Sequence, residues 1–117
     1  MLRNSKRLER LARNFICVNR IEAINRARRL KDEGIYSTIN HTVEHVDSYA
    51  LAGSATMAAC DLLFSIQQWG LTECTSVSIK MSALGMDFDK KWCEENILQI
   101  RNLAYDLGIV VQWDVEG

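Results

Sequence analysis

The sequence predicts an α/β protein of about three αβ units, with a three-stranded parallel sheet that forms part of a (β/α)8 TIM-type barrel. Three observations predict this fold. Apolar side chains at helical spacing alternate with short runs rich in β-branched residues. A glycine, at Gly34, Gly70 and Gly108, ends each predicted helix and is followed at once by Ile or Leu. These glycines lie 36 and 38 residues apart, so one helix and one strand repeat as a unit.

The first unit covers the N-terminal third of the chain. A first helix is expected near the N-terminus, with one face formed by Leu8, Leu11, Ala12 and Phe15. Asn19, followed three residues later by Glu22, has the spacing of a capping box and predicts the start of a second helix. That helix is expected to end at Gly34. Residues 35–40, IYSTIN, then form the first predicted strand.

The two remaining units have the same plan. Asp47 can cap a helix whose inner face carries Ala55, Ala59, Leu62, Leu63 and Ile66. Residues 75–81, TSVSIKM, alternate small polar and apolar side chains with the period of a strand. Asp89 can cap the last helix, which turns inward Cys93, Ile97, Ile100, Ala104 and Leu107. Residues 109–114, IVVQWD, form the third predicted strand.

One face of this predicted sheet is largely polar. It carries alternate residues of the second and third strands: Ser76, Ser78, Lys80, Val110, Gln112 and Asp114. Functional residues of (β/α)8 barrels lie at the carboxyl ends of the strands. Lys80, Asp114 and residues 40–44 are therefore candidate site residues, and Lys80 and Asp114 are expected on adjacent strands, at the same end and on the same face. A complete barrel takes about 250 residues, so this chain of 117 would supply three of eight units.

Composition and charge restrict the class of protein. Apolar residues make up 48% and charged residues 25% of the chain, which is ordinary for a globular domain. Residues 1–31 hold ten of the fourteen Lys and Arg and carry +8, whereas the rest carries −9. A basic segment is typical of proteins that bind nucleic acid or anionic membranes. Because Phe15 is the one aromatic residue among these bases, we expect a solvated helix face and no nucleic-acid partner.

Cysteine spacing and hydropathy point to a reduced protein without a membrane span. The chain shows no C-x-x-C spacing at Cys17, Cys60, Cys74 and Cys93, which indicates buried thiols in a reducing compartment. No apolar run reaches the roughly 18 residues of a transmembrane helix. The charged N-terminus is not typical of a secretory signal, although its Arg-rich, acid-poor composition leaves a mitochondrial presequence as an alternative.

Residues 41–45, HTVEH, match the H-x-x-E-H pattern of a class of zinc metalloproteases. In that class two histidines on one face of a helix bind zinc, and the glutamate activates water. Here the pattern directly follows a predicted strand, so His41 and His45 would not converge, although Glu116 lies at a tolerable spacing for a third ligand. We expect no bound metal and interpret the segment as a strand end. A zinc hydrolase is the least favoured alternative.

Three segments together resemble the proline dehydrogenase family. Residues 76–97, SVSIKMSALGMDFDKKWCEENI, resemble its second strand and the following loop. Residues 110–117, VVQWDVEG, are similar to its third strand, which ends in Asp-x-Glu, and residues 34–46, GIYSTINHTVEHV, to its first strand, which usually closes with Asp-x-Leu-Gly-Glu. The similarity runs from about residue 13 to the end, in the family's order. Residues 1–117 are thus interpreted as an N-terminal fragment of a proline dehydrogenase-like barrel domain.

The resemblance implies a role for four residues. Family members are FAD-dependent oxidoreductases of proline catabolism, which oxidise L-proline to pyrroline-5-carboxylate and pass electrons to a quinone. By this resemblance Lys80 binds the substrate carboxylate, and Asp114 is the catalytic residue near the substrate amine and the flavin. Asn40 stands where the family usually has Asp, Val43 where it usually has Gly, and Glu44 matches the closing glutamate. Asn40 and Glu44 are predicted to support the site.

The resemblance also predicts what this chain lacks. The family's flavin-binding residues lie mainly on later strands and its paired substrate arginines on the last helix, so the full-length enzyme should bind FAD and the 117-residue chain alone should be inactive. The expected substrate is L-proline or a close analogue such as hydroxyproline, and a quinone is the expected acceptor. A cytoplasmic location is implied, with peripheral membrane association left open, or a mitochondrial one in a eukaryote. The main alternative is a non-catalytic α/β binding or structural domain.

Overall fold

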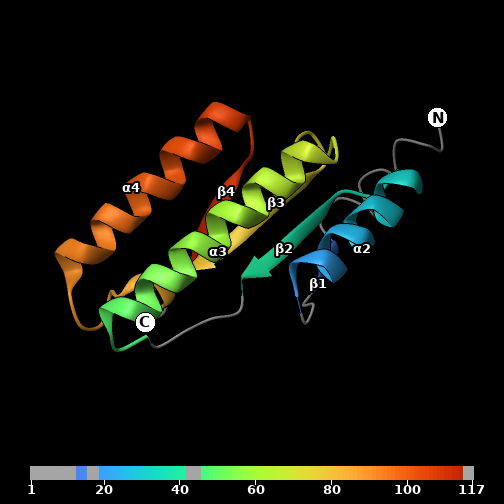
Figure 1. Ribbon diagram of the computed structural model, residues 1–117. Helices are drawn as coiled ribbons and strands as arrows, with labels where there is room; N and C mark the ends of the chain where they lie inside the picture. The colour runs from blue at the N-terminus through green and yellow to red at the C-terminus, as the bar shows by residue number, and fades with distance from the viewer. Residues whose placement is uncertain (1–12, 16–18, 42–45, 115–117) are drawn as a thin grey trace.

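The computed structural model describes residues 13–15, 19–41 and 46–114. Helices and strands alternate along these residues (Figure 1). In order they are β1 (Arg13–Phe15), α2 (Arg20–Asp32), β2 (Ser37–His41), α3 (Tyr49–Gln68), β3 (Thr75–Lys80), the 3₁₀ helix η1 (Met81–Leu84), α4 (Lys90–Leu107) and β4 (Val111–Asp114). The predicted α/β class is confirmed, and each of the three predicted strands is present.

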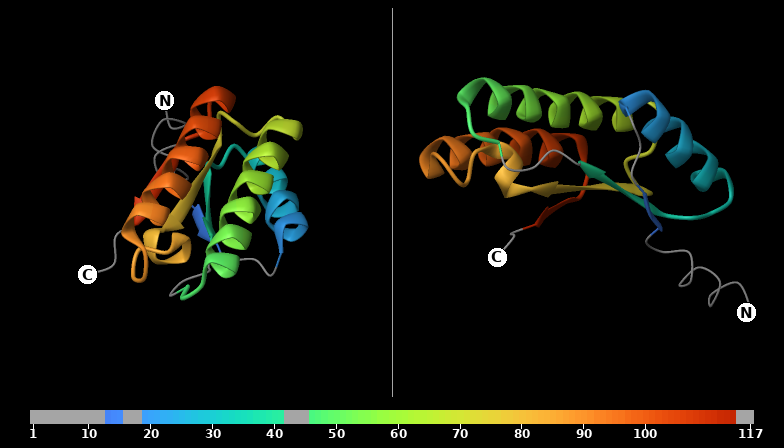
Figure 2. Two further views of the ribbon diagram at one scale, coloured as in Figure 1. Left: turned by 60° about the vertical axis from the view of Figure 1, so that its left-hand side comes forward. Right: turned by 90° about the horizontal axis from the view of Figure 1, so that it is seen from below.

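The strands form one parallel sheet in the order β1-β2-β3-β4. When each strand pairs with the next and every crossover has the usual right hand, the connecting helices all lie on one face. Figure 2 shows α2, α3 and α4 on the same face of the sheet. Sequential strand order with a single helical layer is the arrangement of part of a (β/α)8 barrel, as the sequence predicts.

Strand β1 differs from the prediction. A helix was expected to include Phe15, whereas Arg13–Phe15 pair in parallel with Ser37, Thr38 and Ile39 of β2. This part of the predicted helix is therefore wrong, and its remaining positions, Leu8, Leu11 and Ala12, lie outside the described residues. A strand of three residues is too short for a period of two to be recognised in the sequence.

The helix starts agree closely with the predicted caps. The side chains of Asn19 and Asp89 accept main-chain N–H groups three residues on, at 2.8 and 3.0 Å, and α2 and α4 begin directly after them. Helix α3 is capped instead by Ser48, whose Oγ accepts the Leu51 N–H at 3.1 Å. The prediction of Asp47 is wrong by one residue, because Asp and Ser are equally good caps and adjacent candidates cannot be ranked from sequence.

The helix ends confirm the glycine repeat. Gly34, Gly70 and Gly108 have φ angles of 76°, 69° and 74°, which is the left-handed conformation expected after a helix. After each of these glycines the chain continues into the loop that leads to the next strand. The repeat seen in the sequence is thus a repeat of this helix-ending turn.

Helix α3 contributes most to the core between the helices and the sheet. Eight of its residues are buried, including all five predicted to face inward. By length and composition α3 could cross a membrane, the one such helix in the described part of the chain, although the sequence was expected to contain no such segment. One side of α3 packs in the core with Val77 and Ile79 of β3, whereas Leu51, Met57 and Phe64 of the same helix are exposed.

Candidate functional site

Lys80 and Asp114 end adjacent strands at the same edge of the sheet. They are direct partners in the parallel register of β3 and β4. The preceding residues, Ile79 and Trp113, pack in the core on the helix side, so Lys80 and Asp114 lie on the opposite face. The predicted geometry of this pair is therefore confirmed. It brings a cation and a carboxylate together where barrel enzymes have their active sites.

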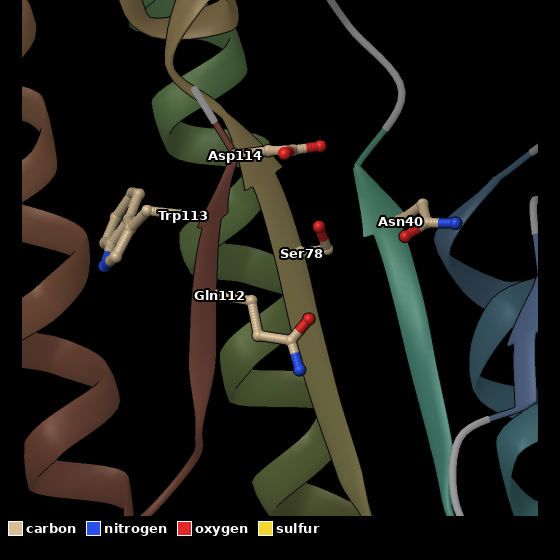
Figure 3. A pocket seen from close by; sticks show the side chains of 5 residues that line it. All are labelled: Asn40, Ser78, Gln112, Trp113 and Asp114. Atoms are coloured by element: carbon tan, nitrogen blue, oxygen red, sulfur yellow. The ribbon is translucent and has the colours of Figure 1, made fainter. Parts of the chain in front are cut away.

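A pocket of about 340 Å³ opens on this face of the sheet. It is lined by Asn40, Ser78, Gln112, Trp113 and Asp114 (Figure 3). Figure 3 shows Asp114 near the strand end, above Gln112, while the indole of Trp113 projects to the other side. Asp114 is the single charged group among the lining residues, and Lys80 is not one of them.

Asn40, Ser78 and Gln112, here called the polar row, occupy one level of the sheet. Asn40 of β2 pairs with Ser78 of β3, and Ser78 pairs with Gln112 of β4. The row lies two residues before Lys80 and Asp114 on their strands, and therefore on the same face. Sequence reasoning placed Asn40 at the site but gave no role to Ser78 or Gln112. The signal was present, because both precede a candidate site residue by one strand period.

Two cross-strand hydroxyl contacts hold β2 and β3 in register below the polar row. The hydroxyls of Thr38 and Ser76 are 2.9 Å apart on the face of the pocket. Those of Ser37 and Thr75 are 3.3 Å apart on the helix side. Such pairs favour one alignment of neighbouring strands, because a shift by one residue would break both and exchange the two faces. This alignment places Asn40 beside Ser78.

His41 is the last residue of β2 and does not face the pocket. It pairs with Ile79, so its side chain lies on the helix side, where Nδ1 is buried without a hydrogen bond and burial lowers the histidine pKa. The motif thus begins on a strand, as predicted, rather than on the helix that H-x-x-E-H zinc sites require. Residues 42–45, with the predicted Glu44, and Glu116 lie outside the described residues. The described residues include no group of three His, Cys, Asp or Glu placed to hold a metal.

The loop that follows Lys80 packs closely beneath helices α3 and α4. Helix η1 ends at Gly85, which has a φ of 101°. A Cβ at this position would lie 3.1 Å from the Phe88 ring and 3.5 Å from that of Trp92. The Asn96 side chain, buried, donates a hydrogen bond to the Leu84 carbonyl at 3.0 Å. These contacts hold the chain directly after Lys80, and so help to fix the end of β3.

A second link joins the starts of α3 and α4 at the same end of the sheet. The Tyr49 hydroxyl donates to Oδ2 of Asp89 at 2.5 Å, and the Tyr49 ring meets Phe88 and Trp92 edge-on at centroid distances of 5.0 and 5.3 Å. The hydrogen bond is the main reason that the pKa of Asp89 is lowered and that of Tyr49 is raised. The first residue of α3 and the cap of α4 are therefore tied together.

Comparison with known proteins agrees with the strand-end motifs. No protein-family model matches the chain. Proline dehydrogenase 2 of Bacillus subtilis (strain 168) and proline dehydrogenase 2 of Bacillus subtilis subsp. natto are each 32% identical to it over 89 residues, or 76% of this chain. The matched stretch is 29% of each relative, so the chain spans less than a third of their length. Over that stretch the chain is related to proline dehydrogenases.

Proposed function

We propose that this chain is the part of a flavin-dependent proline dehydrogenase that carries the substrate-binding residue Lys80 and the catalytic residue Asp114. The observation that carries this proposal is the pairing of these two residues at the carboxyl ends of adjacent parallel strands. The identity to enzymes named proline dehydrogenase 2 supports it. The full-length protein would then oxidise L-proline to pyrroline-5-carboxylate.

The pair suits a zwitterionic substrate. L-Proline carries a carboxylate and a secondary ammonium on the same carbon atom. Neighbouring strands are about 4.8 Å apart, so one small amino acid can reach side chains from both. Lys80 would donate a charge-assisted hydrogen bond to the carboxylate, and Asp114 would accept one from the ammonium. Together they would orient the substrate by its two charged groups. Asp114 would accept the hydrogen bond from an N–H of the substrate ammonium.

FAD would supply the oxidant, but the described residues do not form its site. The lining residues of the pocket include amides, a hydroxyl and a carboxylate, and none of them is cationic. A flavin dinucleotide carries a diphosphate, which binds to basic side chains or to the N-termini of helices. The flavin contacts are therefore expected on later strands, as the resemblance implies. A quinone acceptor, a cytoplasmic or mitochondrial location and peripheral membrane association belong to the same proposal.

The test uses the full-length protein encoded by the gene that contains this segment. We expect the purified protein to show flavin absorbance in the visible range and to reduce an artificial electron acceptor only when L-proline is added. A well-folded, colourless protein without this activity would contradict the proposal. That result would favour the alternative of a non-catalytic α/β binding or structural domain.

A further inference from the structure

Ser78 and Gln112 lie one strand step below Asp114 in the pocket. Ser78 of β3 is the register partner of Gln112 of β4, and Asp114 follows two residues later on the same face. All three line the pocket. In Figure 3 the Asp114 side chain extends from β4 toward β3, the Ser78 hydroxyl is turned toward the same strand end, and the Gln112 amide lies below. The three polar groups therefore face one space from three positions.

The spacing of these groups fits one bridging water better than a direct hydrogen bond. Two residues along a parallel strand advance about 6.6 Å and neighbouring strands are about 4.8 Å apart, so the Cα atoms of Ser78 and Asp114 are separated by about 8 Å. Two hydrogen bonds through a water oxygen span about 5.5 Å, and the two short side chains can cover the remainder. Among the described residues, neither Ser78 nor Gln112 is hydrogen-bonded directly to the Asp114 carboxylate.

The chemistry of the three groups suits a bound water. A well-held water needs two to four polar partners, and the pocket of about 340 Å³ has room for one. The Gln112 amide can donate to it, the Ser78 hydroxyl can donate or accept, and the Asp114 carboxylate accepts. The terminal torsion of an aspartate has a broad energy minimum. A hydrogen bond to one carboxylate oxygen would therefore fix the orientation of the other.

We infer that Ser78 and Gln112 are positioning residues for Asp114, because they hold one water against its carboxylate. That water fixes the free carboxylate oxygen in the direction from which the substrate amine arrives. The inference rests on the proposed function, in which Asp114 is the catalytic residue. Lys80 binds the substrate carboxylate separately, so losing this water should lower kcat and leave KM nearly unchanged. Small errors in the placement of a catalytic group reduce the rate in this way.

The test measures kcat and KM for L-proline in variants of the full-length protein. Ser78→Ala should lower kcat about threefold to tenfold, which is the effect of one neutral hydrogen bond, and should change KM less than twofold. Ser78→Thr keeps the hydroxyl and should retain most of the wild-type kcat. Gln112→Met keeps the length of the side chain but removes the amide, and it should lower kcat by a similar factor. Circular dichroism of each variant detects any loss of fold.

A double-mutant cycle shows whether Ser78 acts through Asp114. In the Asp114→Ala background, Ser78→Ala should cause no further loss of kcat, because the group that the water orients is already gone. A residue that supports only the strand would lower kcat by the same factor in both backgrounds. The matched control is Ser76→Ala, which removes a hydroxyl from the same face of β3 one step further from Asp114, where it contacts Thr38 at 2.9 Å. It should leave kcat unchanged.

Four results would overturn the inference and leave the proposed function intact. They are an unchanged kcat in Ser78→Ala, a change in KM alone, an equal loss of kcat in Ser76→Ala, and a further loss when Ser78→Ala is added to Asp114→Ala. Absence of proline-dependent turnover in the wild type would refute the proposed function, and the inference with it.

Discussion

Lys80 lies beside Asp114, on the same face of the sheet as the pocket, because the strand period places it there. Ile79 is fully buried on the helix side, and the next residue must therefore lie on the other face. The role proposed for it makes a direct prediction. In the full-length protein, Lys80→Ala should raise KM for the substrate roughly tenfold to hundredfold, since a hydrogen bond to a charged group is worth about 1.5–3 kcal/mol. Lys90→Ala, at the exposed start of α4, is the control. An unchanged KM in Lys80→Ala would remove this residue from the site.

The Tyr49–Asp89 hydrogen bond predicts a dependence of stability on pH. The folded-state pKa of Asp89 is lowered, mainly by the Tyr49 hydroxyl, so its contribution is present above the ordinary value of 3.8 and is lost as pH falls through the lowered value. The pKa of Tyr49 is raised, so that contribution is lost as pH rises above its ordinary value of 10.0.

Urea unfolding as a function of pH measures this effect. Tyr49→Phe should be less stable than the wild type near neutral pH, and the difference should shrink in acid as Asp89 becomes protonated. Tyr105→Phe is the matched control, because the Tyr105 side chain is 86% exposed on α4. A difference between wild type and Tyr49→Phe that stays constant from neutral to strongly acid pH would show that the hydrogen bond does not perturb Asp89.

At the scale of the elements, the sequence allowed the helices and the main strands to be predicted. Amphipathic spacing, end caps and the three glycines are local signals, and they located α2, β2, α3, β3, α4 and β4. Strand β1 was missed because its pairing with β2 is a tertiary contact between distant residues, with little pattern of its own. The cap of α3 was displaced by one residue for a similar reason, since Asp47 and Ser48 are chemically equivalent as caps.

The candidate site was predicted less completely than the fold. The strand period sufficed to bring together Lys80 and Asp114, because both lie at predicted strand ends. Gln112 was not recognised as a lining residue, because a pocket depends on the shape of three strands side by side. The resemblance pointed to Asn40 and Glu44, of which the structure places Asn40 in the pocket while Glu44 lies outside the described residues. The catalytic and binding roles remain predictions.

Replacing two glycines by alanine should change the free energy of unfolding in opposite directions. Gly85→Ala should lower the free energy of unfolding by about 1–3 kcal/mol, because its φ of 101° and the Phe88 ring 3.1 Å from the new methyl both oppose the change. Gly53→Ala, inside α3 with no atom within 4 Å of the new Cβ, should raise it by about 0.5–1 kcal/mol. Urea denaturation of both variants gives the comparison. Equal effects would show that the loop after η1 is not packed as described.

At the scale of the whole molecule, the helices of the described residues all lie on one face of the sheet (Figure 2). Parallel sheets are normally covered on both faces, and a closed barrel achieves this when its own strands face one another across the interior. In the described part of the chain, the face opposite these helices carries Asn40, Ser78, Gln112 and Asp114 around a pocket rather than an apolar surface. A polar interior near the carboxyl ends of the strands is the arrangement that a barrel enzyme uses to bind a charged substrate.

We propose that Asp114 acts on a cyclic amino acid bound beside it. The most direct measurement is anaerobic mixing of the flavin-loaded, full-length protein with L-proline or 4-hydroxy-L-proline, followed by the loss of flavin absorbance. Bleaching should be rapid in the wild type. In Asp114→Ala bleaching should be slower by at least tenfold, with similar flavin content, and in the control Asp106→Ala, on exposed α4, it should be unchanged. Bleaching as fast in Asp114→Ala as in the wild type would contradict the catalytic role proposed for Asp114.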